Sequence, residues 1–500
     1  MIRITDILDK IYDYNPDANV ALIDRAYIYS ARVHEGQVRL SGEPYLSHPL
    51  EVADILADMM LDVEIIENTP PKDLAEHTRH NASVYDNWLQ AKEAHATPAV
   101  LIGGGPSIND HIDDIKRLKK DGATIFAMNG SSKWAHDHGI EVDAQIILDA
   151  KEETSTLVDG FAANHYFSSQ CHPKTTGSVG NVTIWHLARP DIELLFPPEK
   201  VKRGGYVIVG GDSTVGICAL CLVYTQGYRK LHCFGYDTSY KDKQGHGYIQ
   251  DVNKTMPSIP ITWDGVDYTI SIAMKDQVGN FLSYSTALEK IGCEFEVYGD
   301  GLLQSVYRSD PSTLSEQDKY RLMWMFSSYR MVSPGEANVD FYIDKFKPVG
   351  RIIDFGCGTG KAGIKFSEAG YSVTLIDFAD NCRDNKAMDL PFIEWDLTEE
   401  MPFTAENGFC TDVMEHIPTE DVDKVIRNIM TSAEKVFFQI STEDDALGGF
   451  IDCTLHNTIK PYEWWYSKFV SNGYNVVWSD EHAIAALFYI SNPDRRETWQ

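Results

Sequence analysis

The feature that most constrains the fold of this 500-residue chain is a pair of glycine-rich turns, each of which follows a short apolar run. The first turn, GGGPSIND at 103–110, follows AVLI, and the second, DFGCGTG at 354–360, ends the run VGRIID. A buried strand that enters a glycine turn and then a helix is typical of α/β domains that bind a ligand at the carboxyl ends of their strands. Short apolar runs alternate with helical patterns after both turns. The sequence therefore predicts the α/β class, with two tandem Rossmann-like, doubly wound domains.

The pattern of apolar residues divides the chain into five segments. The first carries apolar residues at helical spacing and predicts a small α-helical segment ahead of the two α/β domains. TPPKD then breaks the pattern, and LSEQDKYRLMWMFSSYRM gives a helical pattern between the two glycine-turn regions. We therefore expect a helical segment at 1–62, a linker at 63–96, a first α/β domain at 97–305, a helical connector at 306–347 and a second α/β domain at 348–500.

The charge of the chain limits its partners. The sequence holds 74 Asp and Glu against 44 Lys and Arg, a formal net charge of −30, which disfavours broad binding to nucleic acids or anionic membranes. Nine cysteines without a regular framework fit reduced thiols. The start, MIRITDILDK, lacks the apolar core of a signal peptide, and no run approaches the roughly 18 apolar residues of a membrane span. We therefore expect a cytoplasmic protein that does not bind membranes, and its oligomeric state stays open.

The second glycine turn belongs to an ordered set of motifs. The next predicted strand ends in Asp377, a third ends at Asp396, and a fourth leads into TDVMEHIP at 411–418. An acid at the end of the second strand is well placed to accept hydrogen bonds from two ribose hydroxyls. This set, over roughly 348–495, resembles the class I S-adenosylmethionine (SAM)-dependent methyltransferases. The GxGxG spacing fits that family better than a dinucleotide dehydrogenase.

The resemblance implies SAM as the cofactor and gives each motif a part of it. The glycine turn is expected at the methionyl part, the acid of the second strand at the ribose and the acid of the third strand at the adenine. The implied cofactor-binding residues are Asp354, Gly356, Gly358, Gly360, Asp377, Asp396, Leu397 and Asp412.

Three side chains near the expected acceptor end of the cleft are candidates for catalysis. Methyl transfer mainly needs an acceptor aligned with the methyl group, and a general base is needed only if the acceptor loses a proton. His416, beside Glu415, is the first candidate base, although a polar residue at a helix start is an equally good interpretation. His456, in LHNTIKPYEWW, is the second candidate, and a surface-loop histidine is its slightly favoured alternative.

The first glycine turn is followed by polar residues at the ends of successive predicted strands. This set, over roughly 97–305, resembles the archaeal 6-hydroxymethylpterin pyrophosphokinases (MptE-like) and the motility-associated flagellin glycosyltransferases. The resemblance implies a nucleotide, either ATP or a nucleotide-sugar, and Mg²⁺ held by carboxylates. A helix cap or turn role is the alternative for each Asp taken singly. The implied nucleotide-binding residues are Gly103, Gly104, Gly105, Pro106, Ser107, Asn129, Ser213 and Thr214, and the implied metal ligands are Asp149 and Asp237.

The N-terminal stretch HEGQVRLSGEPYLSHPLEVADIL, at 34–56, resembles the start of the HD hydrolase domain of RelA/SpoT alarmone enzymes. The resemblance places His48 on a metal ligand of that family and Arg39 near the guanine. The His-Asp pair that completes the family's metal site does not follow in this segment. Since one His cannot hold a catalytic metal, we expect no alarmone hydrolysis from this truncated segment.

Three functions follow as hypotheses. The first is a SAM-dependent methyltransferase joined to a nucleotide-dependent transferase-like domain, both acting on one small polar or glycan acceptor. The second makes pyrophosphate or sugar transfer by the first α/β domain the main activity. The third is a binding or assembly protein without enzymatic activity.

Overall fold

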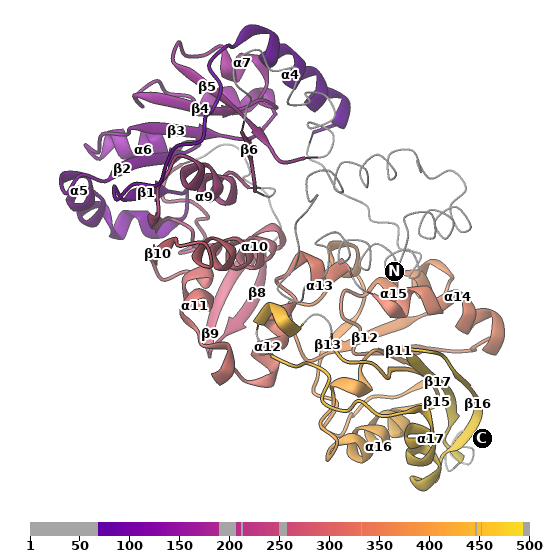
Figure 1. Ribbon diagram of the computed structural model, residues 1–500. Coiled ribbons are helices and arrows are strands. Elements are labelled where there is room, and N and C mark those ends of the chain that lie inside the picture. Colours follow the sequence, from indigo (N-terminus) through magenta and orange to yellow (C-terminus); the bar gives the residue numbers. More distant parts are fainter. Residues whose placement is uncertain are drawn as a thin grey trace, which may run out of the picture.

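The structure is a computed structural model that describes residues 69–189, 207–211, 214–249, 258–331, 333–445, 448–451 and 453–493. Two α/β domains follow one another along the chain, the first at the upper left and the second at the lower right of Figure 1. The predicted fold class is therefore confirmed. The helical segment predicted at 1–62 lies outside the described residues, as do His48 and Arg39.

The first domain is built on an eight-stranded sheet in which all paired neighbours run parallel. The order of the sheet, β10-β7-β1-β2-β3-β4-β5-β6, places the glycine turn after β1 in its interior. The strands are β1 (Ala99–Ile102), β2 (Thr124–Met128), β3 (Ala144–Ile147), β4 (Asn164–Ser168), β5 (Val182–Leu187), β6 (Ile208–Val209), β7 (Lys230–Phe234) and β10 (Glu294–Val297).

Helices cover both faces of this sheet, which explains why its central strands are apolar throughout. Successive side chains of β1 point to opposite faces: Leu101 packs in one core with Leu220 of α9, and Val100 packs in another with Ile115 of α5. A hairpin of β8 (Ser258–Trp263) and β9 (Val266–Ser271) is added beside the sheet. The helices are α4 (Pro71–Val84), η1 (Pro106–Asp110), α5 (Ile112–Lys120), α6 (Ser131–Asp137), η2 (Glu152–Leu157), α7 (Pro173–Thr176), α9 (Val215–Thr225), α10 (Ile272–Glu289) and α11 (Leu302–Arg308).

The second domain is built on a seven-stranded sheet of order β13-β12-β11-β14-β15-β17-β16. Its first five strands in that order are parallel, and β17 runs antiparallel to both β15 and β16. The strands are β11 (Ile352–Phe355), β12 (Val373–Asp377), β13 (Phe392–Glu394), β14 (Ala405–Thr411), β15 (Ala433–Ser441), β16 (Asn475–Glu481) and β17 (Ala485–Ser491).

The apolar residues of β14 show how the two faces of this sheet are filled. Phe409 packs on one face with Phe366 and Tyr342, and Cys410 packs on the other with Ile426. The strand ends therefore meet along one edge of a sheet that is covered on both sides. The helices of this domain are α14 (Pro334–Phe346), α15 (Lys361–Glu368), η5 (Asn385–Ala387), η6 (Met414–His416), α16 (Val422–Ser432), η7 (Gly448–Ile451) and α17 (Tyr462–Ser471).

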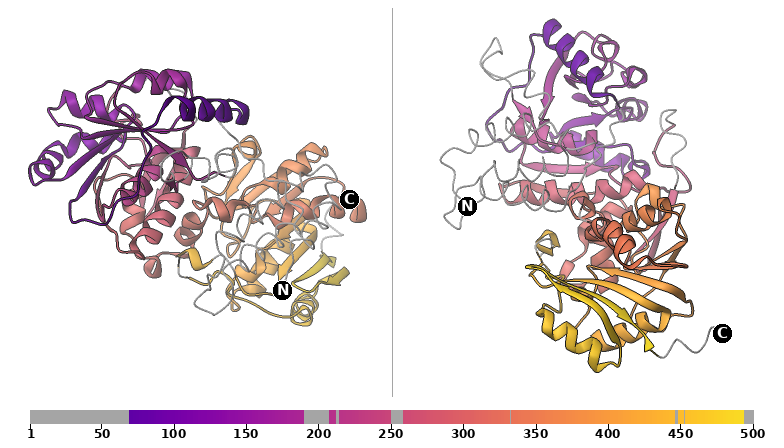
Figure 2. Two further views of the ribbon diagram at one scale, coloured as in Figure 1. Left: turned by 45° about the horizontal axis from the view of Figure 1, so that its top comes forward. Right: turned by 90° about the vertical axis from the view of Figure 1, so that its right-hand side faces the viewer.

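Short helices between the sheets bring the two domains into contact (Figure 2). They are η4 (Pro311–Thr313), α12 (Glu316–Met323) and α13 (Ser327–Met331). A Cβ atom on Gly279 of α10 would lie 2.1 Å from the backbone oxygen of Met325, so α10 packs directly on this segment. Lys275, also on α10, is fully buried and donates hydrogen bonds to the backbone oxygens of Asn381 (2.7 Å) and Arg383 (3.3 Å) of the second domain.

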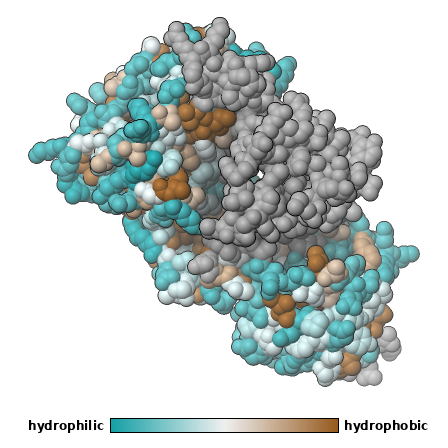
Figure 3. Space-filling model, viewed as in Figure 1, coloured by the Kyte–Doolittle hydropathy of each residue, from teal (hydrophilic) through white to brown (hydrophobic). Residues whose placement is uncertain are grey.

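Among the residues that Figure 3 colours by hydropathy, the surface is mostly hydrophilic, with small separate apolar patches. None of the helices in the described part of the chain has the length and apolar character needed to cross a membrane.

Candidate functional sites

The turn after β11 lets the backbone pass close to its neighbours. Gly356, Gly358 and Gly360 have positive φ angles of 67°, 49° and 78°, which favour glycine. A Cβ atom on Gly356 would lie 2.4 Å from the side chain of Val413, and one on Gly358 would lie 2.7 Å from the ring of Trp324. The three glycines of the predicted motif are therefore required by the geometry of the turn.

Two buried carboxyl groups flank this turn. Asp377, at the end of β12, accepts hydrogen bonds from the backbone N–H groups of Gly358 and Ala379, both at 3.0 Å, and burial raises its pKa to about 6. Burial and then the nearby Asp377 raise the pKa of Asp354 to about 7. The Oδ2 atom of Asp354 is buried without a hydrogen-bond partner. A buried polar atom of this kind needs a partner, and each oxygen of Asp377 keeps a second lone pair.

These features fit the cofactor that the sequence implies. The unpaired oxygen of Asp354 is available to a ligand ammonium group, and Asp377 is available to hydroxyl donors. An open cavity of about 800 Å³ continues from Phe378, the residue after Asp377, to the segment after β13. Asp396 lines this cavity and accepts a hydrogen bond from the backbone N–H of Thr398 (2.8 Å), whereas Leu397 is buried.

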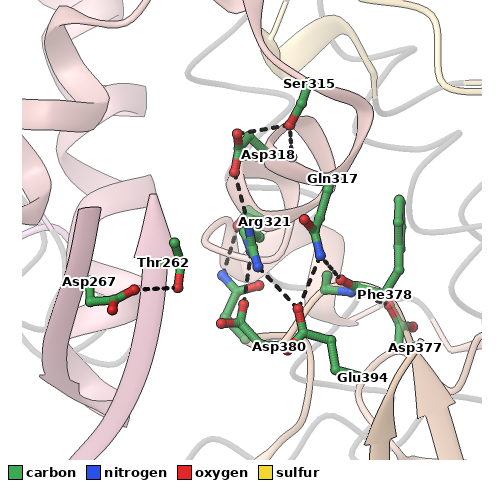
Figure 4. A network of polar contacts seen from close by, with 12 residues as sticks. Thr262, Asp267, Ser315, Gln317, Asp318, Arg321, Asp377, Phe378, Asp380 and Glu394 are labelled. Carbon is green, nitrogen blue, oxygen red and sulfur yellow. Dashed lines mark hydrogen bonds and ion pairs between the residues drawn. The ribbon is translucent and has the colours of Figure 1, made fainter. Parts of the chain in front are cut away.

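One wall of the cavity comes from α12, in the segment that the sequence predicts only as a connector. Arg321 is buried, and its guanidinium group contacts Asp380 (3.0 Å) and Glu394 (3.2 Å) of the second domain and Asp318 (3.1 Å) of its own helix. Figure 4 shows this network, in which Gln317 also donates to Glu394 (3.1 Å). Helix α12 is thereby fixed to the loop that follows β12 and to the end of β13.

Sequence reasoning missed the part that this connector plays in the site. Its aromatic side chains approach the predicted residues: Trp324 covers Gly358, and the hydroxyl group of Tyr320 lies 2.8 Å from Nδ1 of His416. The signal was present as the aromatic-rich run YRLMWMFSSY at 320–329, but a helical pattern does not show which site its aromatic residues cover.

The acceptor end of the predicted site lies after β14, where Asp412 has a positive φ of 53°. A non-glycine residue in this conformation is a recurrent feature of functional sites. Burial raises the pKa of Asp412 to about 6, and burial together with Asp412 raises the pKa of Glu415. Gln439 donates to Asp412 (3.3 Å), and the backbone N–H of Ser441 donates to Glu415 (3.0 Å).

Two histidine rings complete this end of the site. The rings of His416 and His456 lie edge to face, with centroids 4.8 Å apart. Burial lowers the pKa of His416 to about 4, which keeps its ring neutral at neutral pH. Nδ1 of His456 lies 2.8 Å from the backbone oxygen of Glu443. The structure thus brings the three predicted catalytic side chains, Glu415, His416 and His456, together within reach of one another.

The glycine turn of the first domain is packed against β7 and the residues after it. Cβ atoms on Gly103 and Gly105 would lie 2.4 Å from the backbone oxygen of Gly235 and 2.1 Å from Asp237. Both carboxylate oxygens of Asp237 accept hydrogen bonds, one from the backbone N–H of Ser107 (3.0 Å) and one from Gln304 (3.1 Å). Asp237 is buried, which raises its pKa. Asp237 therefore stabilises the glycine turn through its hydrogen bonds to Ser107 and Gln304.

The other predicted residues of the first domain lie at different strand ends. Asn129, after β2, has a positive φ of 51° and a buried Oδ1 atom without a partner. Thr214 caps α9, with its Oγ1 accepting from the N–H of Ile217 (3.4 Å), and Ser213 lies outside the described residues. Asp149 follows β3 and accepts from the backbone N–H of Lys151 (3.0 Å).

The two predicted metal ligands are not neighbours in the sheet. Asp149 follows β3 and Asp237 follows β7, and β1 and β2 lie between those strands. Three strand spacings amount to roughly 14 Å, so these carboxylates are not placed to bind one ion together.

Two side chains that are not among the predicted site residues cover the first glycine turn. A Cβ atom on Gly104 would lie 2.8 Å from the ring of His246 and 3.2 Å from the hydroxyl group of Tyr248. His246 is half-buried, and burial lowers its pKa. His232, by contrast, is buried away from the turn and lies 3.1 Å from the hydroxyl group of Tyr298.

Comparison with known families agrees with this division. A family model described as 6-hydroxymethylpterin diphosphokinase MptE-like matches residues 72–243, and a family model described as methyltransferase domain matches residues 323–488. The chain joins an MptE-like domain to a methyltransferase domain. The resemblances that the two glycine turns predict are thereby confirmed. The match to the methyltransferase domain begins at residue 323, inside the predicted connector, and the predicted domain boundaries stay predictions.

Part of the chain is also similar to RelA/SpoT proteins, as its N-terminal motifs predict. GTP pyrophosphokinase rsh of Brucella melitensis biotype 1 is 35% identical over 120 residues, which are 24% of this chain and 14% of that protein. The bifunctional (p)ppGpp synthase/hydrolase SpoT of Escherichia coli K12 is 44% identical over 69 residues, 12% of this chain and 10% of that protein. The chain thus spans only a small part of the length of these curated relatives.

Solved structures also resemble parts of this chain. The alignment with a MAf glycosyltransferase from Magnetospirillum magneticum AMB-1 covers 60% of this chain and 50% of that protein. Its TM-score is 0.37, and the two sequences are 15% identical over it. A magnesium protoporphyrin IX methyltransferase from Synechocystis PCC 6803 covers 35% of this chain and 93% of its own, with a TM-score of 0.28 and 16% identity. At these scores the likeness carries no conclusion about activity.

Proposed function

We propose that the chain is a SAM-dependent methyltransferase whose MptE-like domain is a nucleotide-dependent transferase, and that both domains act on one small polar or glycan acceptor. The observation that carries the proposal is the buried, unpaired Oδ2 atom of Asp354 beside the glycine turn, next to Asp377 and the open cavity. A carboxylate kept in this state is suited to the ammonium group of a ligand.

The residues of the methyltransferase domain would divide the cofactor between them. Asp354 and the turn from Gly356 to Gly360 would hold its methionyl part, Asp377 its ribose hydroxyls, and the segment at Asp396 its adenine. When bound, SAM supplies an electrophilic methyl group on a positively charged sulfur. The protein's task is then to align an acceptor and exclude water, since the leaving group needs no further activation.

Calorimetry with S-adenosylhomocysteine (SAH) and the full chain tests this proposal. We expect one binding site, and we expect Asp377→Ala to weaken binding by roughly 100-fold because two charge-assisted hydrogen bonds are lost. Asp389→Ala is the matched control, because Asp389 is an exposed carboxylate on the next loop. No binding of SAH, or equal binding by both variants, contradicts the proposal.

A specific observation also favours activity of the MptE-like domain. Asn129 combines a positive φ with a buried, unpaired Oδ1 atom at the carboxyl end of β2, next to the strand that carries the glycine turn. Strained residues at such strand ends recur in binding sites. Incubation of the full chain with ATP and a hydroxymethylpterin, or with CMP- and UDP-sugars, tests this activity. Absence of turnover with every donor contradicts pyrophosphate or sugar transfer by the MptE-like domain.

A further inference from the structure

A group of metal-binding side chains lies at the acceptor end of the methyltransferase domain. Glu415 and His416 belong to η6, directly after β14, and His456 belongs to the loop that precedes α17. One ligand atom of each of the three lies within 4.8 Å of the others. The sheet thus brings together two imidazole rings and one carboxylate from segments 40 residues apart in sequence.

Hydrogen bonds hold both imidazole rings in place. Nδ1 of His456 lies 2.8 Å from the backbone oxygen of Glu443, and Nδ1 of His416 lies 3.2 Å from the backbone oxygen of Leu455. A carbonyl oxygen only accepts, so Nδ1 of His456 carries the hydrogen and its Nε2 carries the lone pair that a metal needs. Metal-binding histidines are held in this way, by a bond from the second ring nitrogen to a backbone carbonyl.

Tyr320 also contacts this ring. Its hydroxyl group lies 2.8 Å from Nδ1 of His416 and 3.4 Å from the backbone oxygen of Leu455. The orientation of the His416 ring is therefore set from two sides. Tyr320 comes from α12, so the connector also supports this site.

The carboxylate is available as well. Glu415 is fully buried, and its Oε1 atom accepts a hydrogen bond from the backbone N–H of Ser441 (3.0 Å). Its Oε2 atom is buried with no hydrogen-bond partner. A second carboxyl group, that of Asp412, lies in contact with it. Two buried carboxylates side by side are stabilised by a cation between or beside them.

We propose that Glu415, His416 and His456, with Asp412 beside them, bind a divalent transition-metal cation that keeps open positions for an acceptor oxygen. Two imidazole nitrogens and one carboxylate suit Mn²⁺, Fe²⁺, Co²⁺ or Zn²⁺ better than Mg²⁺ or Ca²⁺, which prefer oxygen ligands throughout. Three protein ligands leave room for the oxygen of a substrate.

This site sharpens the proposed function, on which its placement at the acceptor end rests. It favours a hydroxyl-bearing acceptor, because a cation of this kind makes a hydroxyl group more acidic. In the transfer, the acceptor oxygen bonds to the methyl carbon and the carbon–sulfur bond breaks with its electron pair on sulfur. The hydroxyl proton passes to solvent, so O–H becomes O–CH3 and SAH leaves.

The described residues contain one other group of potential ligands, Cys357, Asp377 and Cys382. Its three members are buried, and burial raises the pKa of both thiols. Asp377 is also committed to two backbone N–H groups. A thiol binds metal as the thiolate, so this second group is much less suited to an ion.

Titration of the chelator-treated full chain with Mn²⁺, followed by electron paramagnetic resonance, tests the site. We expect one tight site per chain, and we expect His456→Ala to weaken it at least roughly tenfold. The matched control is His482→Ala, because His482 is an exposed histidine beside Asp480. Equal affinity in both variants, or no tight site in the unmodified chain, overturns the proposal.

Two further measurements separate this proposal from the proposed function. Calorimetry with SAH on the metal-free chain reports the cofactor site alone, so a failure there is distinguishable from a failure to bind Mn²⁺. Catechol is the probe for the acceptor class: its addition to the Mn²⁺-loaded chain is expected to change the resonance spectrum. An unchanged spectrum overturns the assignment of a hydroxyl-bearing acceptor.

Discussion

The two glycine turns follow the same sequence plan but differ in what their acids do. In the MptE-like domain both oxygens of Asp237 are bonded within the protein, to Ser107 and Gln304. In the methyltransferase domain one oxygen of Asp354 has no hydrogen-bond partner. A buried acid that holds its own turn stabilises the fold, whereas a buried acid left unpaired favours a ligand. Equivalent motifs therefore do not imply equivalent sites.

The two turns also differ in which part of the chain supplies the side chains that cover them. His246 and Tyr248, from the MptE-like domain itself, lie over Gly104. Trp324, which lies at the start of the methyltransferase match, covers Gly358, and Lys275, on helix α10 of the first α/β domain, holds the loop that follows Asp377. The first site is thus completed locally, and the second depends on the other domain.

The sharpest test of the comparison is Asp237→Ala, which we expect to reduce the free energy of unfolding by about 3 kcal/mol. The loss leaves the N–H of Ser107 and the amide of Gln304 buried without their acceptor. Urea unfolding of the full chain, followed through the first transition, measures it. Asp149→Ala is the matched control and is expected to change stability by no more than about 0.5 kcal/mol. Equal changes in the free energy of unfolding for Asp237→Ala and Asp149→Ala would contradict the structural role of Asp237.

A second test uses the raised pKa of Asp354, which is about 7 because of burial and the nearby Asp377. An acid whose pKa is raised by folding stabilises the fold fully below its unfolded pKa of about 4, and this contribution is lost as the pH rises through 7. Asp354→Asn stays uncharged, so its stability relative to the unmodified chain should rise by on the order of 2 kcal/mol between pH 4 and pH 8. Urea unfolding across that range measures the difference, and a pH-independent difference would contradict it.

A smaller effect is expected from Lys275→Met. Its Nζ atom anchors the loop after Asp377, and burial lowers the pKa of this lysine to about 7. Loss of the anchor should weaken SAH binding threefold to tenfold, about 1 kcal/mol. Calorimetry measures it, with Lys290→Met, on the exposed end of the same helix, as control. Unchanged affinity in Lys275→Met would mean that the methyltransferase site does not depend on the other domain.

The strands that carry the site could be predicted from the sequence, because buried parallel strands are short apolar runs that end in glycine turns or acids. The edge strands β16 and β17 of the second sheet could not be predicted in this way. AALFYIS of β17 is apolar throughout, so its length and composition do not separate a strand from a helix, and NVVWSDE of β16 is largely exposed. The hairpin β8–β9 could not be predicted either, because buried and exposed residues alternate only partly along its two strands.

Residue roles were harder to predict than strand positions. The sequence places Glu415, His416 and His456 near one site, but it does not show that a backbone carbonyl fixes the tautomer of His456. It also places both Asp237 and Asp377 at the ends of predicted strands, the first as a metal ligand and the second at the ribose. The difference between them depends on Gln304 and on Asp354, whose contacts are set by tertiary packing alone.

Lys275 has a consequence for the history of the gene. A fusion of two modules is reversible as long as each module keeps a complete surface of its own. Here the buried Lys275 of the first domain donates hydrogen bonds to backbone carbonyl groups of the second domain. Gly279 packs so closely on the backbone of Met325 that no side chain fits there. Splitting the gene between these modules would expose both surfaces at once. Once such a contact has formed, selection for the stability of one domain also keeps the other domain in the same chain.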